Sequence, residues 1–180
     1  MSKNIVKKFK IFWAWQDEKE EIWLSEMDKQ GFHLEKISLP GWYKFSIGES
    51  RKFIYRLDFQ SLRSKDRESY LQLFADSGWE HVGNMSSWEY FRREVQPGDT
   101  PDIYSDVESK TGKYRRVMIY LSILLPIMIV LKPDGSDRYG PFLYFFYYIL
   151  EGFYILLILF FSYSIIQLFR RINQLNKKNK

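Results

Sequence analysis

The chain has 180 residues, of which 46% are hydrophobic, and a formal net charge of +5. Residues 1–112 hold 17 Lys and Arg against 19 Asp and Glu, and residues 113–180 hold 10 against 3, so the two net charges are −2 and +7. The basic excess therefore belongs to the C-terminal third, and the N-terminal part lacks the positive charge of a nucleic-acid-binding domain. The absence of Cys excludes disulfides, thiolate nucleophiles and Cys-based metal sites.

Residues 8–48 and 52–94 follow the same predicted order of elements. Each stretch begins with apolar residues that alternate with charged ones, in Phe9–Trp13 and in Lys52–Phe59. This alternation predicts a half-buried strand at the start of each stretch.

A helix is predicted after each of these strands. Asp17 and Glu20 have the spacing of a capping box, which predicts a helix that begins at Asp17. Gly31 and Gly78 are predicted to end the two helices in the left-handed conformation, which glycine adopts readily.

Two more strands are predicted after each helix, at residues 32–37 and 42–45 and at residues 79–82 and 88–91. The order strand–helix–strand–strand thus occurs twice. It predicts an α+β fold with a duplicated β-α-β-β unit of the ferredoxin-like type, in which helices cover one face of an antiparallel sheet. We expect this soluble domain to occupy residues 1–95.

The rest of the chain has the composition of a membrane segment. Residues 96–113 are predicted to form a polar connector, and residues 114–180 a two-helix transmembrane hairpin with a basic tail. Val117–Leu131 has no charge but is short for a span, which needs about 20 apolar residues. Pro126 predicts a kink there, and a buried core helix is the alternative. The second segment, Tyr139–Phe169, is long enough to span.

Basic residues flank the predicted hairpin on both sides: Lys113, Arg115 and Arg116 before it, and Arg170 and Arg171 after it. We expect them to anchor the chain at anionic headgroups. The positive-inside rule places both flanks, and therefore both termini, in the cytoplasm, with the neutral loop 132–138 outside. A protein of the cell membrane with two spans is therefore expected, and the lipid bilayer is its first partner.

Glu151 is the one ionisable residue in the second predicted span. Charged residues at membrane depth are rare and often functional, so Glu151 is a candidate intramembrane polar site. The alternative is that Glu151 lies near the outer interface or pairs with a polar group of the first helix.

The segments Phe9–Trp15 and Glu20–Leu34 resemble the opening of an uncharacterised bacterial family, the domain of unknown function 2812. Tyr55–Phe59 and Gly78–Gly83 are similar to further parts of that domain, and Ile103–Lys110 is similar to the motif that ends it. The resemblance implies C-terminal membrane helices and a gene encoded beside a PadR-type transcriptional regulator. By analogy it implies a regulatory role. The family has no assigned catalytic residues, so the resemblance supplies none.

The sequence contains no Gly-rich phosphate loop, no nucleophile elbow and no His-Glu-x-x-His motif. His33 and His81 hold similar places in the two halves and could join Glu35, Asp58 or Glu80 in a metal or acid–base site. Two His without a spaced third ligand are a weak metal signal, however. We therefore predict no catalytic residue, no metal site and no cofactor.

Four aromatic residues, Trp42, Tyr43, Trp88 and Tyr90, are candidates for a partner or ligand surface. They would be exposed if two short helices cover only one face of the sheet. The alternative is that they pack in the core, as aromatic residues of small sheet domains usually do.

These features favour a non-enzymatic, membrane-anchored regulatory or sensory protein. Its cytoplasmic domain would bind a ligand or a protein partner, such as a transcriptional regulator, and would not bind nucleic acid directly. Two alternatives remain: a small membrane enzyme or transporter accessory subunit, and a purely structural element that self-associates through the hairpin.

Overall fold

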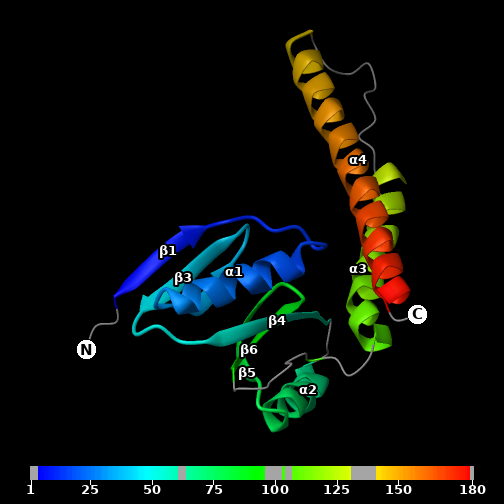
Figure 1. Cartoon of the computed structure of the whole chain (residues 1–180). Coiled ribbons are helices and arrows are strands. Elements are labelled where there is room, and N and C mark those ends of the chain that lie inside the picture. Colours follow the sequence, from blue (N-terminus) through cyan, green and yellow to red (C-terminus); the bar gives the residue numbers. More distant parts are fainter. Residues whose placement is uncertain (1–3, 61–63, 96–102, 104–106, 131–140, 179–180) are drawn as a thin grey trace. The chain divides into compact units, whose positions relative to one another are not determined.

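The computed structural model of the chain describes residues 4–60, 64–95, 103, 107–130 and 141–178 (Figure 1). The chain divides into two compact units, Met1–Lys113 and Tyr114–Lys180. The described residues contain two three-stranded sheets and four helices, so the predicted α+β class is confirmed.

The first half of the N-terminal unit contains β1 (Ile5–Phe9), α1 (Asp17–Lys29), β2 (Phe32–Ser38) and β3 (Trp42–Ile47). Its strands are antiparallel in the order β1-β3-β2. The first strand ends at Phe9, where the predicted strand began. The alternation of apolar and charged residues does not continue upstream of Phe9, where β1 reads Ile-Val-Lys-Lys-Phe, so the strand is placed by its pairing with β3.

The second half contains β4 (Phe53–Phe59), α2 (Ser64–Asp76), β5 (Glu80–Met85) and β6 (Trp88–Glu94), close to the predicted bounds. Its strand order, β4-β6-β5, repeats that of the first half. The strands form two separate sheets, so the ferredoxin-like assignment and a common origin of the halves stay predictions.

Helix α1 contributes side chains to a hydrophobic core that the two halves share. Leu24 and Met27 of α1 pack in one cluster with Phe45 of β3 and with Tyr55 and Leu57 of β4. Burying a large apolar side chain of this kind contributes roughly 1.5–3 kcal/mol. Because α1 contacts both sheets, the two halves fold as parts of one unit.

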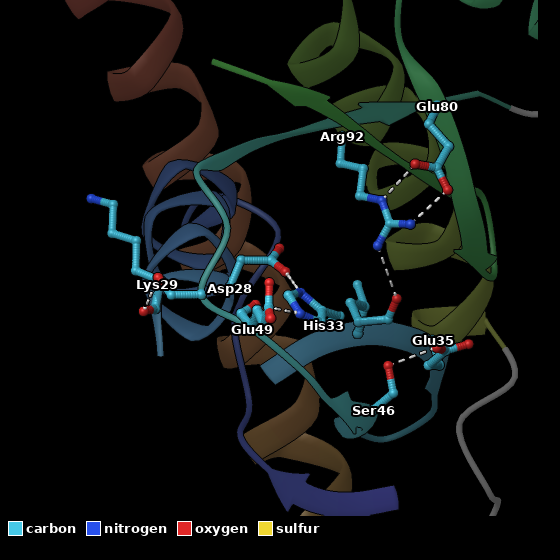
Figure 2. A network of polar contacts seen from close by, with 10 residues as sticks. Asp28, Lys29, His33, Glu35, Ser46, Glu49, Glu80 and Arg92 are labelled. Atoms are coloured by element: carbon cyan, nitrogen blue, oxygen red, sulfur yellow. Dashed lines mark hydrogen bonds and ion pairs between the residues drawn. The ribbon is translucent and has the colours of Figure 1, made fainter. Parts of the chain in front are cut away.

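The sheets also meet along a seam between β2 and β5. Arg92 of β6 donates two hydrogen bonds to the carboxylate of Glu80 on β5, at 2.6 and 2.8 Å (Figure 2). A third, longer contact of 3.5 Å joins the Arg92 guanidinium to the carbonyl oxygen of Leu34 on β2. One arginine thus links both sheets.

The C-terminal unit contains most of α3 (Val107–Val130) and all of α4 (Pro141–Lys178). Within the described residues, Tyr147–Lys177 is the one helical stretch that is long and apolar enough to cross a membrane. Length and composition therefore support a membrane helix at the position of the second predicted span.

The first helix of the predicted two-helix hairpin is not supported as a span. The apolar part of α3 runs from Val117 to Val130, about 14 residues, or about 21 Å of helix. The hydrocarbon core is about 30 Å thick, so this segment is too short to qualify as a span. Two spans with both termini in the cytoplasm are therefore not supported. The predicted loop 132–138 and most of residues 96–106 lie outside the described residues.

Gly31 and Gly78 provide a matched test of backbone packing. Both have a left-handed backbone, with φ of 81° and 80°, as predicted for the ends of the helices. A Cβ on Gly31 would overlap the backbone carbonyl oxygen of Gly48, whereas a Cβ on Gly78 would meet only the Arg93 side chain, at 3.7 Å.

We expect Gly78→Ala to destabilise the N-terminal unit by about 1–2 kcal/mol through its backbone conformation. Gly31→Ala should cost about 1–3 kcal/mol more because of the overlap. All six Trp lie between residues 13 and 88, so Trp fluorescence during denaturant unfolding of the full chain in detergent reports on this unit alone. Equal losses in the two variants would contradict the close approach of Gly31 to Gly48.

Candidate functional site

The N-terminal unit buries an unusual number of acidic side chains. Six of them are at most 5% exposed: Asp17, Glu20, Glu21, Asp28, Asp58 and Glu89. Three of the six lie in the first two turns of α1. Burying a charge is costly unless it is paired and hydrogen-bonded, so the partners of these carboxylates define the candidate site.

Lys113, in the part of α3 that belongs to the N-terminal unit, is the cation of the site. It is 1% exposed, and its Nζ lies 2.5 Å from Asp17 Oδ2 and 3.9 Å from Glu21 Oε1. Burial lowers the pKa of Lys113, but the two carboxylates outweigh this effect and the net shift is upward. Lys113 is therefore charged at neutral pH. We call Asp17, Glu21 and Lys113 the Lys113 cluster.

The Lys113 cluster also closes the edge of the second sheet. The backbone N–H of Leu57 donates to Glu21 Oε1 at 2.9 Å, and its carbonyl oxygen accepts from Lys113 Nζ at 3.2 Å. Next to it, the carbonyl oxygen of Tyr55 accepts from Arg56 at 2.8 Å. These side chains satisfy backbone groups of β4 that would otherwise offer an open strand edge to another chain.

Glu20 joins the two sheets from the centre of the unit. Its Oε1 accepts hydrogen bonds from the hydroxyls of Tyr43 on β3 and Tyr90 on β6, both at 2.7 Å. Burial raises the pKa of Glu20, and the two hydroxyls only partly oppose this. The pKa values of both Tyr rise because burial and the Glu20 carboxylate disfavour a phenolate. The carboxyl of Glu20 therefore takes up a proton more readily than an exposed one.

A small cavity of about 30 Å³ lies beside these carboxylates. Its walls combine the two acids with apolar and aromatic side chains: Phe12, Trp13, Ala14, Asp17, Glu20, Leu57, Met85, Trp88 and Tyr90. A space of this size holds about one or two waters and is too small for an organic ligand. Water in this cavity could hydrate the carboxyl groups of Asp17 and Glu20 and exchange protons with them.

The predicted aromatic surface is wrong for two of its four residues. Tyr43 and Tyr90 are 1% and 0% exposed, whereas Trp42 is 45% exposed and Trp88 packs partly against the core. Successive residues of a strand point to opposite faces, so Trp42 and Tyr43 cannot share a surface. Of the predicted set, Trp42 remains available to a partner.

The residues of the predicted basic flank differ in their exposure. Lys113 lies inside the buried cluster and does not face headgroups. Arg115 and Arg170 are exposed, and Arg116 and Arg171 are half-buried, in the C-terminal unit. Their contact with headgroups stays a prediction.

The two His are held by separate partners in separate sheets. His33 contacts Asp28 through Nδ1, and its Nε2 lies 2.9 Å from the carbonyl oxygen of Glu49 (Figure 2). The Nε2 of His81 lies 2.7 Å from Glu89 Oε2, and Glu89 also binds Arg67. Within the described residues no three potential ligands converge on a metal position. The structure thus holds each of the two His in its own set of polar contacts.

Glu151 is half-buried in α4, inside the candidate membrane helix. Its role as an intramembrane site stays a prediction. The Lys113 cluster, by contrast, was missed by the sequence reasoning. The sequence does contain a pattern that could have predicted it. Asp17, Glu20 and Glu21 have the spacing that places them on the same helical face as Leu24 and Met27, which predicts buried carboxylates.

Comparison with known families confirms the resemblance noted in the sequence. Residues 16–126, more than half of the chain, match the family described as "Protein of unknown function (DUF2812)". Comparisons with curated proteins and with solved structures gave no match.

We expect Lys113→Met to destabilise the N-terminal unit by about 3–5 kcal/mol, because it leaves two carboxylates buried without their cation. The matched control is Lys110→Met, since Lys110 lies 4.0 Å from Glu18 and both side chains are partly exposed. Its expected cost is below about 1 kcal/mol. Adding Asp17→Asn to Lys113→Met should restore part of the loss. Equal effects of the two lysine variants on Trp-detected unfolding would contradict the cluster.

The pH dependence of unfolding tests the protonation of Glu21. Burial raises its pKa from 4.5 to about 7, against the attraction of Lys113. The folded state therefore keeps a proton that the unfolded chain has released, and this contribution to stability, full below pH 4.5, is lost as the pH rises through 7. Each such proton changes the free energy of unfolding by up to about 1.4 kcal/mol per pH unit.

Glu21→Gln keeps the acceptor for Leu57 and should flatten this decline between pH 4.5 and 7. Glu20 contributes a decline of the same sign, so the informative quantity is the difference between the wild type and the variant. The control is Glu26→Gln, on the exposed side of α1. An unchanged slope in Glu21→Gln would show that Glu21 is already ionised below this range.

Proposed function

We propose that this chain, which belongs to the DUF2812 family, is a membrane-anchored regulatory protein whose N-terminal unit binds a ligand or a protein partner. Its candidate anchor is α4. The observation that carries the proposal is the position of Lys113. The helix that contains it begins in the N-terminal unit and continues into the apolar stretch after Arg116.

This continuity gives a physical route for regulation. A partner that binds one arrangement of α1 better than another shifts the population towards that arrangement. Any shift of Asp17 or Glu21 changes the ion pairs of Lys113, and therefore the start of α3. In this proposal, the Lys113 cluster is the element whose arrangement the partner biases, and α3 carries the change along the chain towards α4.

The partner we propose is a transcriptional regulator of the PadR type, on the basis of the family resemblance. Such a partner requires the N-terminal unit to be cytoplasmic. This can be tested directly, because the chain has no Cys of its own. A single cysteine at Gln72, an exposed position on α2, should react with a membrane-impermeant maleimide after lysis and not in intact cells.

The function is tested with a reporter gene under the promoter that the proposed PadR-type regulator controls. Deleting the gene for this chain should change reporter output several-fold, and the wild-type gene should restore it. Lys113→Met should behave as the deletion does, while Lys110→Met should behave as the wild type, with both proteins present at equal levels in the membrane. Unchanged output on deletion, together with no binding of purified regulator to the full chain in detergent, would reject the proposal.

A further inference from the structure

The outer face of the first sheet carries a row of three lysines. Lys7 of β1 is paired with Lys44 of β3, which is paired in turn with Lys36 of β2. Directly paired side chains lie about 5 Å apart at Cβ. The neighbours of Lys44 in β3, Tyr43 and Phe45, are buried on the opposite face, so the three lysines point away from α1.

No side chain in the described part of the chain forms an ion pair with these three lysines. None of them takes part in a hydrogen bond, an ion pair or a ring contact there. The neighbouring lysines differ: Lys8 lies over the Phe32 ring at 4.1 Å, and Lys10 lies over the Trp23 ring at 4.8 Å.

The rest of the sheet does not balance the charge of the row. Glu35 is the one acidic residue of its three strands. Its carboxylate lies on the same face as the row, because it accepts a hydrogen bond at 2.7 Å from Ser46, two residues from Lys44, so one negative charge stands against three positive ones. Like charges directly opposite each other destabilise a sheet. The lysine row thus lowers the stability of the fold and is suited to an anionic surface outside it.

Exposed apolar side chains border the lysine row. Phe9 and Trp42 form the next cross-strand pair, with ring centroids 4.8 Å apart, and are 50% and 45% exposed. On the other side of the row Ile5 is 57% exposed. A face with lysines in the middle and a Trp at its border has the composition of a surface that lies at the headgroup level of a bilayer.

We propose that this face of the first sheet, formed by Lys7, Lys36, Lys44, Phe9 and Trp42, docks on anionic phospholipid headgroups. The lysines contact lipid phosphates, and the two aromatic rings enter the interface beside them. A phospholipid surface fits better than a nucleic acid, because the rest of the N-terminal part is acidic and would repel a long polyanion. The candidate membrane helix belongs to the same chain, so it would tether the N-terminal unit to a bilayer and raise the effective concentration of the lysine row there.

The docking can be measured on the full chain in vesicles. A single cysteine replaces Ser38, which is paired with Trp42 on the same face, and carries an environment-sensitive fluorophore. The matched reporter is Gln72→Cys on α2. Vesicles contain nitroxide-labelled lipid in phosphatidylcholine alone or mixed with phosphatidylglycerol. Flotation of the protein with the vesicles reports anchoring, and quenching of the fluorophore reports docking.

We expect quenching at Ser38→Cys only in vesicles with phosphatidylglycerol, weakened by salt. Combining Lys7→Gln, Lys36→Gln and Lys44→Gln should lower the ratio of docked to undocked protein roughly a hundredfold, at about 1 kcal/mol per lysine. The triple variant should remain folded, because it removes like-charge repulsion.

The matched control neutralises three exposed lysines outside the sheet, Lys19, Lys29 and Lys52, and should leave quenching unchanged. Three results would overturn the docking: equal quenching at both reporters, equal quenching in both lipids, or an equal loss of quenching in the control variant. Failure of the chain to float would instead reject the membrane anchor, and with it the function proposed above.

Discussion

The carboxylates on the buried face of α1 require a buried cation, and the rest of the N-terminal unit is arranged around the one that Lys113 supplies. Its ammonium pairs with Asp17, approaches Glu21 and binds the backbone of β4. Removing the lysine leaves its carboxylates buried without a cation, away from water. The cluster therefore fixes three elements at once: the start of α1, the edge of the second sheet and the first turns of α3.

Glu20, one turn into α1, is a second buried acidic residue that connects elements, at the centre of the fold. Two tyrosine hydroxyls, one from each sheet, reach its carboxyl group. A buried polar network of this kind specifies the mutual position of the elements that contribute to it, because an imperfect arrangement leaves polar groups unpaired. The two halves are thus joined by a shared apolar core and by hydrogen bonds that converge on one helix.

Local patterns predicted the local structure well. The alternation of apolar and charged residues located β4. Asp17 marked the start of the first helix, and Gly31 and Gly78 marked the ends of the two helices. The capping box was wrong, because Asp17 is used in the Lys113 cluster and the N-cap residue is Gln16, without a side-chain cap. Contacts between residues far apart in sequence leave no local periodic signal, so Lys113 looked like part of a membrane flank. The grouping of Trp42 with Tyr43 overlooked the two-residue period of a strand.

The position of Lys113 places the C-terminal limit of the N-terminal unit later in the chain than the sequence predicts. By sequence, the soluble part ends near residue 95, where the last strand stops. A fragment cut there would lack the cation that Asp17 and Glu21 need, and the edge of β4 at Leu57 would be open to pairing with another molecule. Such a fragment should aggregate even though all six strands and both of its helices are present. The compact N-terminal unit of this chain reaches into the helix that follows it, and includes Lys113.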